Sequence, residues 1–291
     1  MKAIELNEVA VQNLSLTEKQ LELVRTQFEL GAVNKTDLLK GKVKRGQAQA
    51  ELLSSGQNLR SARRNFFFAM GIFDRGESFR SFNKNILSYR LPEEKTLIIS
   101  IKENNPDIKV QRSLIESAKL SYMISKGMRF PLINAGINYS VIGENSKEWI
   151  DNLKDDWTLG INLSISIPIF TSKGMSSQIE QKRIQWNRQT EDFSTLKNNL
   201  NVQALDLLEV LRHYLDVLPI QSQVVESAEE DLTLIQERYS LGAASILEVL
   251  NAQVSLNQAS TSWVNMKYDF WVSAASLKAF TGDLNENFGT E

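Results

Sequence analysis

The sequence predicts a mainly α-helical protein, built from long antiparallel helical hairpins, with one two-stranded β-hairpin. Three observations lead to this fold class. Only 5 prolines and 14 glycines occur in 291 residues, so few residues interrupt the helices. One helix–turn–helix pattern occurs twice. Two segments, 132–142 and 157–169, instead alternate between apolar residues and small or polar ones, as β-strands do.

An internal repeat relates residues 21–48 to residues 232–259 at a constant offset of 211, and the alignment needs no gap. Nine of the 28 aligned positions are identical. An ungapped register that includes a shared turn is uncommon between unrelated helices. We therefore interpret the two segments as copies of one duplicated unit.

The shared turn has the residues that end one helix and begin the next. In the second copy, Gly242 suits the left-handed conformation that follows a helix. Ser245 is then an N-cap, and Glu248 lies three residues later, which is the spacing of a capping box. The matching residues of the first copy are Gly31, Asn34 and Asp37. Each copy is thus predicted to be an antiparallel helical hairpin.

The pattern divides the chain into segments of different character. We expect a partial first repeat at 1–71, a connector at 72–91, a complete second repeat at 92–282 and a tail at 283–291. The second repeat is predicted to contain a helix at 106–128, strands at 132–142 and 157–169, a long helix at 172–240 and a return helix at 245–281. Helices this long need neighbours lying side by side.

The long helix also carries a periodic apolar pattern before Gly242. Its apolar positions there are Ile220, Val224, Ala228, Leu232, Ile235 and Tyr239. Their mean spacing is about 3.8 residues, which predicts straight or slightly right-handed packing.

The strand at 157–169 separates two kinds of side chain completely. Its polar side holds only Thr, Gly, Asn, Ser and Pro, without Lys, Asp or Glu. A membrane β-strand of about 9–11 residues has this pattern, apolar toward lipid and polar toward a lumen. The predicted lipid-facing residues are Leu159, Ile161, Leu163, Ile165 and Ile167. A sheet of a soluble protein with one buried face would alternate too.

The composition excludes several kinds of function. There is no cysteine and one histidine, so thiolate and histidine metal sites are not expected. A formal charge of −2 provides no general attraction for nucleic acid. The sequence shows no glycine-rich phosphate loop and no plausible nucleophile–base pair. We expect neither an enzyme nor a bound cofactor.

Taken together, these features resemble the TolC-like family of outer membrane efflux proteins. The segments that carry the resemblance are Arg238–Ala259, Glu103–Lys119 and Trp157–Gly174. The resemblance implies a homotrimer, with a helical α-barrel across the periplasm and a β-barrel of four strands per chain in the outer membrane lipid. It implies a passive export duct of a tripartite efflux pump or type I secretion system. The implied partners are a periplasmic adaptor (membrane fusion) protein and an inner-membrane transporter.

The first copy is shorter than the resemblance implies, since it has no strand pair upstream. The first residues also read as amphipathic helix and not as a signal peptide. We therefore expect the C-terminal part of a longer protomer, whose full-length form would lie in the outer membrane of a Gram-negative bacterium. The alternative is a soluble periplasmic coiled-coil adaptor or scaffold. Such a protein would place charged residues on the polar side of the strand at 157–169.

The resemblance also assigns residues at the helix tips. The implied channel gate comprises Thr36, Asp37, Tyr239, Glu248 and Asn251. The implied adaptor-docking tips comprise Leu30, Gly31, Ala32, Asn34, Leu241, Gly242, Ala243 and Ser245. The family's tip arginine is replaced by Ala244, and Asn251 replaces an acidic residue, so a gate with fewer ionic contacts is expected. Helix capping explains Asp37 and Glu248 equally well, and both roles can coexist.

Overall fold

The computed structural model of the protein describes residues 1–74, 76, 86, 89–141, 157–170 and 173–282. Most of the expected connector and the whole of the expected tail lie outside these residues. The chain forms two compact units, which we describe one at a time. One unit is Met1–Leu97 with the chain from Gln203 onward, and the other is Ile98–Val202. The mainly α-helical fold class with one β-hairpin is confirmed.

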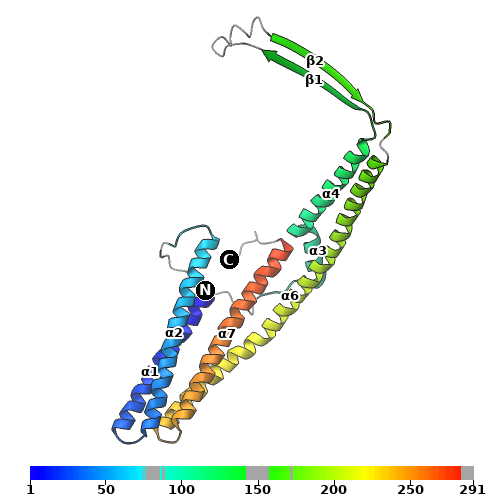
Figure 1. Ribbon diagram of the computed structural model, residues 1–291. Coiled ribbons are helices and arrows are strands. Elements are labelled where there is room, and N and C mark those ends of the chain that lie inside the picture. The colour runs from blue at the N-terminus through cyan, green and yellow to red at the C-terminus, as the bar shows by residue number, and fades with distance from the viewer. Residues whose placement is uncertain (75, 77–85, 87–88, 142–156, 171–172, 283–291) are drawn as a thin grey trace. The chain divides into compact units, whose positions relative to one another are not determined.

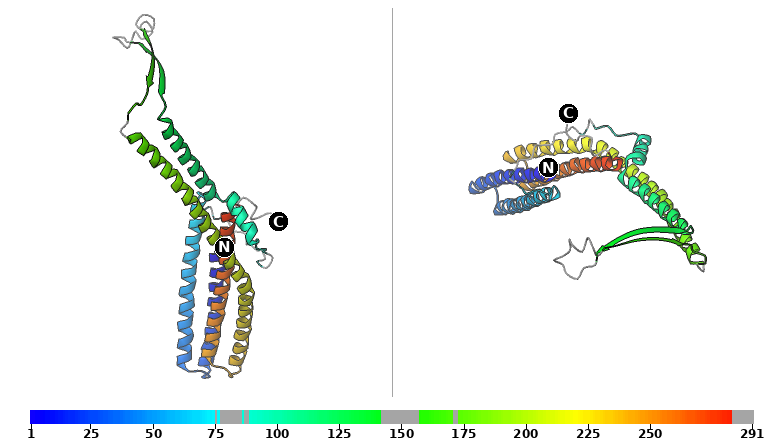
Figure 2. Two further views of the ribbon diagram at one scale, coloured as in Figure 1. Left: turned by 90° about the vertical axis from the view of Figure 1, so that its right-hand side faces the viewer. Right: turned by 90° about the horizontal axis from the view of Figure 1, so that it is seen from above.

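The first unit is a bundle of helices. It contains α1 (Lys2–Glu29), α2 (Lys35–Ala69), the later part of α6 (Gly174–Ser240) and α7 (Ile246–Thr281). The helices run side by side, and both tip turns lie at the same end of this unit (Figures 1 and 2). Among the described helices, none has a stretch both long and apolar enough to cross a membrane.

The buried positions of α1 and α6 repeat every 3.5 residues on average. On α1 they are Ala10, Asn13, Thr17, Gln20 and Val24. On α6 the seam before the tip follows the buried or half-buried residues Leu218, Gln221, Val225, Ala228, Leu232, Ile235 and Tyr239, and Gln236 beside Ile235 is half-buried as well. Alternating steps of three and four residues form the heptad seam of coiled coils.

The apolar positions of α6, spaced about 3.8 residues apart, are therefore not all on the seam that this unit buries. Ile220 and Val224 are 61% and 45% exposed within this unit, and the half-buried Gln221 lies on the buried seam near them. The side chain of Gln221 donates from Nε2 to the carbonyl of Ala259 on α7, over 3.2 Å. The sequence pattern misleads here because the seam includes a polar residue and leaves two apolar residues outside it.

The second unit holds a helical pair and the β-hairpin. Its helices are α4 (Pro106–Gly127), the first part of α6, and most of α3 (Glu94–Asn104), which the sequence did not indicate. Asn105 separates α3 from α4. As expected of an N-cap, its Oδ1 accepts from the N–H of Asp107 over 2.9 Å and from that of Ile108 over 3.1 Å.

The two strands, β1 (Leu132–Val141) and β2 (Trp157–Ser166), pair antiparallel in register over ten residues each. The expected end of the second strand at Ile169 was wrong. Leu132, which follows Pro131 at the start of β1, pairs with Ser166. Residues 167–169 therefore have no residue of β1 opposite them, and Pro168 has no N–H to donate to a ladder.

Candidate functional site

Each helix tip turns through a glycine in the left-handed conformation. The φ angles are +74° at Gly31 and +73° at Gly242. The N–H of Gly31 donates to the carbonyl of Phe28, and that of Gly242 to the carbonyl of Tyr239, both over 3.0 Å. The two turns thus have matching backbones, as expected from the duplicated sequence.

The residues beside these glycines project from the tips. Leu30 is 79% exposed and Leu241 is 82% exposed. Ala32 and Ala243 are also exposed. An apolar side chain at the apex of each turn is available to a partner, as the docking hypothesis requires.

The second tip has a complete capping box. The N–H of Glu248 donates to Oγ of Ser245 over 3.3 Å, and the N–H of Ser245 donates to Oε1 of Glu248 over 3.0 Å. The hydrogen bond from the Ser245 N–H, with further help from its hydroxyl and the charge of Arg238, lowers the pKa of Glu248. The capping role proposed for Glu248 from sequence is therefore present in the structure.

The first tip has only half of this arrangement. The N–H of Asp37 donates to Oδ1 of Asn34 over 3.1 Å, but the Asp37 carboxylate pairs with Nζ of Lys40 over 3.3 Å. Asn251 occupies the position of Lys40 in the second copy and is exposed, as is Thr36. An aspartate is one methylene shorter than a glutamate, which explains why the weaker Asn-x-x-Asp box remains open.

A groove of about 760 Å³ lies between the two tips and brings most of the predicted tip residues together. Asp37 and Tyr239 both line it, together with both tip glycines. Tyr239 is 5% exposed, and its hydroxyl is buried without a hydrogen-bond partner among the described residues. Burial and, to a smaller extent, the charge of Asp37 raise the pKa of Tyr239, so the hydroxyl keeps its proton at neutral pH.

The core beneath the tips joins both copies of the repeat. Val24 of α1 and Val249 of α7 are fully buried in it, and Leu232 and Tyr239 come from α6. Because Tyr239 belongs to this core as well as to the groove, its ring position is fixed by packing.

The β-hairpin separates its two faces almost completely, and only Leu132, opposite Ser166, places a large apolar side chain on the polar face. Opposite residues of an antiparallel pair share a face, so Ile137 lies beside Ile161, and Ile133 beside Ile165. The residues predicted to face lipid are exposed to between 51% and 76% of their area: Leu159, Ile161, Leu163, Ile165 and Ile167. Within the second unit, nothing among the described residues covers this apolar face.

The polar face of the hairpin pairs each glycine with an asparagine. Gly136 lies opposite Asn162, and Asn138 lies opposite Gly160. A Cβ atom at Gly136 would lie 2.6 Å from Oδ1 of Asn162, and one at Gly160 would lie 3.1 Å from Nδ2 of Asn138. Asn162 and Asn138 therefore each lie over the glycine opposite, and this face carries no charged side chain.

Comparison with known proteins shows the family of this chain. Residues 97–283 match the model of a family described as "Outer membrane efflux protein". The chain belongs to this family.

Relatives in this outer membrane efflux protein family match almost the whole chain. The outer membrane protein TolC of Escherichia coli is 21% identical over 294 residues, which cover 95% of this chain and 59% of TolC. The outer membrane efflux protein BepC of Brucella suis is 21% identical over 286 residues, covering 97% of this chain and 61% of BepC. The chain spans about three-fifths of the length of these relatives.

Solved structures have the same fold. The CmeC outer membrane channel of Campylobacter jejuni matches with a TM-score of 0.81 at 13% identity, over 97% of this chain and 60% of CmeC. The outer membrane protein VceC of Vibrio cholerae matches with a TM-score of 0.77 at 17% identity, over 97% of this chain and 66% of VceC.

Sequence reasoning missed one group of residues in this efflux family member. Several amides on α1 and α7 are buried between the two copies, among them Asn13, Gln20 and Gln253. The heptad spacing of Asn13 and Gln20, which are seven residues apart, was the signal that could have found them.

Proposed function

We propose that the chain forms part of an export duct in the outer membrane, as a passive conduit of a tripartite efflux pump or type I secretion system. In this role β1 and β2 contribute to a transmembrane β-barrel, and the long helices contribute to a trimeric α-barrel. The proposed partners are two further copies of the chain, a periplasmic adaptor protein, an inner-membrane transporter and outer membrane lipid.

One observation carries the proposal: the β-hairpin has an exposed apolar face, and its opposite face is uncharged and, apart from Leu132 at one end, polar or small. Such strands match the 9–11 residues that cross a bilayer when tilted. The aromatic pair at the loop end also fits a barrel, because the rings of Tyr139 and Trp157 stack with centroids 6.0 Å apart. Outer-membrane barrels carry aromatic residues at their interfaces.

The tip residues receive two roles under this proposal. The exposed apices of the turns at Gly31 and Gly242 would dock the adaptor. The groove between them would form the channel gate, with Tyr239 and Asp37 as its central pair and Thr36, Glu248 and Asn251 around it. The hydroxyl of Tyr239 supports this role, because a buried donor that finds no partner in the described part of the chain is available to a neighbouring protomer.

The experiment adds the same charge to opposite faces of β2. Ile161 is 76% exposed on the apolar face, and the neighbouring Asn162 lies on the polar face. The chain is produced with an export signal in a Gram-negative host, as Ile161→Asp and as Asn162→Asp. Membrane fractions and heat-modifiable migration are then compared with those of the unsubstituted chain.

We expect Ile161→Asp to abolish assembly in the outer membrane, because a lipid-facing charge near the bilayer midplane costs about 2–4 kcal/mol for the basic residues and somewhat less for Asp. Asn162→Asp should assemble normally, because its new charge faces water. The proposal fails if both variants assemble equally well, or if the unsubstituted chain remains entirely in the soluble fraction.

A further inference from the structure

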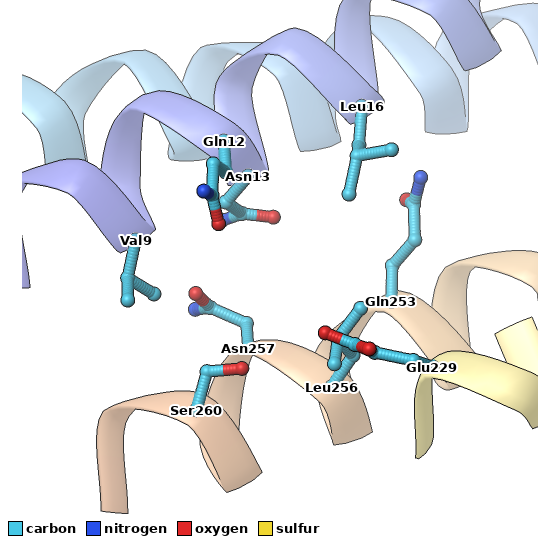
Figure 3. A pocket seen from close by; sticks show the side chains of 9 residues that line it. All are labelled: Val9, Gln12, Asn13, Leu16, Glu229, Gln253, Leu256, Asn257 and Ser260. Carbon is cyan, nitrogen blue, oxygen red and sulfur yellow. The ribbon is translucent and has the colours of Figure 1, made fainter. Parts of the chain in front are cut away.

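A small polar pocket lies within the first unit, where α1 of the first copy meets α7 of the second (Figure 3). Its volume is about 40 Å³. Asn13 enters it from α1, while Gln253 and Asn257 leave α7 on the side that faces α1. The glutamate Glu229 on α6 lines it as well. None of these residues has a part in the proposed gate or docking tips.

The pocket contains hydrogen-bonding groups that the protein leaves unused. Gln253 is 2% exposed, yet neither its Nε2 nor its Oε1 has a hydrogen-bond partner among the described residues. Oδ1 of Asn257 is also buried without a partner there. Leaving a buried amide group unsatisfied is destabilising, so such groups ordinarily have a partner.

Other amide groups at the pocket form hydrogen bonds within the protein. Glu51 of α2 accepts a hydrogen bond from Nδ2 of Asn13 over 3.1 Å and another from Nδ2 of Asn257 over 3.1 Å. This carboxylate connects α1 and α7 at the pocket. Nδ2 of Asn13 and Nδ2 of Asn257 thus each donate to this carboxylate, whereas Oδ1 of Asn257 accepts from none of the described residues.

The unused groups determine the chemistry of the ligand. Gln253 offers both a donor and an acceptor, and exchanging its amide atoms does not change this, because both are without partners. A metal cation would satisfy only the oxygens and would leave Nε2 without an acceptor. Among the described residues, no group of three or more acidic or histidine side chains could hold a metal ion. Water both donates and accepts, and 40 Å³ has room for roughly two or three water molecules.

We propose that this pocket binds ordered water, and that the bound water joins the two copies of the repeat by bridging Gln253 and Asn257 to the α1 side of the seam. The contact between the two copies then contains water at the pocket, whereas the core beneath the tips is apolar. The proposal concerns the seam within one chain and is independent of the export function.

A high-resolution crystal structure of the assembled protein, with its salt replaced by rubidium chloride, tests the ligand directly. We expect water density at hydrogen-bonding distance, about 2.7–3.2 Å, from both amide atoms of Gln253. An anomalous rubidium peak in the pocket would overturn the proposal. It would also be overturned by an empty pocket, or by direct protein partners for both amide atoms.

The substitution Gln253→Met tests the energetic consequence, because methionine has the length of glutamine without its hydrogen-bonding groups. If water satisfies the amide, the melting temperature falls by about 2–4 °C, since the bridging bonds are lost. If the amide is dry and unsatisfied, the melting temperature rises or is unchanged, and the proposal is wrong. Gln258→Met, at an exposed position of the same helix, is the matched control and should change little. If Gln253→Met does not fold, the crystal structure of the unsubstituted protein decides alone.

Discussion

The two helix tips have the same backbone and different side-chain chemistry. Their glycines differ by one degree in φ, at +74° and +73°. In the second tip Glu248 closes a capping box onto Ser245, whereas in the first tip Asp37 turns to Lys40 instead. The glycine and the N-cap are therefore sufficient to set the turn. The acidic residue three positions later was then able to acquire different contacts in the two copies.

The helix before each turn shows a second difference. Tyr239 is 5% exposed, while Phe28, at the equivalent position of the first copy, is 37% exposed. The second copy therefore buries a tyrosine ring. The first copy has a phenylalanine ring at the same position, and that ring is more exposed. The gate hypothesis depends on this asymmetry, because only Tyr239 has a hydroxyl to donate.

The largest effect expected at the tips comes from the feature that they share. Gly31→Ala and Gly242→Ala should each lower the free energy of unfolding by about 1–2 kcal/mol, because a left-handed conformation is strained for residues with a Cβ atom. No atom lies within 4 Å of an added Cβ at either position, so no clash contributes. Urea unfolding of the two variants measures both values. A clear difference between them would show that the turns are not energetically equivalent.

The next effect separates the two caps. Ser245→Ala should cost about 1 kcal/mol or slightly more, because it removes the cap and also one bond to the Glu248 carboxylate. Asn34→Ala should cost less, since the first box is only half formed. The same unfolding measurement ranks them. Equal losses would mean that closing the box adds no stability to the second tip.

The tips were predictable from sequence because their signals are local. A glycine followed three residues later by Asn34 or Ser245 specifies a helix end and a helix start within a few positions. The faces of β2 were equally accessible, because alternation assigns each residue of a strand to a side. The end of β2 was not predictable from its own sequence, because a strand ends where its partner ends. The partner β1 begins after Pro131, which lies outside β2.

The helical seams were the least predictable part. Ile220 and Val224 are apolar but lie outside the seam of α6, while Gln221 lies on it. Likewise, the amides Asn13 and Gln253 lie between helices, where hydropathy alone would place leucine or valine. Which stripe of a long helix is buried depends on its neighbours, and one sequence does not specify them.

A smaller effect at the second tip is the dependence of stability on pH in acid, through the carboxylate of Glu248. The pKa of Glu248 lies below its usual value of 4.5, because the ionised carboxylate accepts hydrogen bonds from Ser245. A depressed folded-state pKa gives stability that is fully present above the unfolded-state value and is lost as pH falls through the folded-state value. NMR titration of labelled glutamate should show this depression, and Ser245→Ala should raise the pKa toward 4.5. A Glu248 pKa that does not respond to Ser245→Ala would assign the depression to the backbone N–H of residue 245, which alanine keeps, and not to the serine hydroxyl.

The smallest effect on stability is expected from replacing Tyr239 with phenylalanine, the residue at the equivalent position 28. This substitution is also the sharpest test of the difference between Tyr239 and Phe28. Tyr239→Phe should leave the urea midpoint of the chain unchanged or slightly higher, because the hydroxyl has no partner among the described residues.

In an assembled trimer the proposed gate gives that hydroxyl a carboxylate partner at Asp37, so Tyr239→Phe should raise single-channel conductance in planar bilayers. Phe28→Tyr is the reciprocal control and should leave conductance as it is, because Phe28 is not among the residues that line the groove between the tips. Unchanged conductance in Tyr239→Phe would remove Tyr239 from the gate and leave its ring with a packing role only. A rise in both variants would show that the tips respond to any change at this position, which would make the asymmetry between the copies irrelevant to gating.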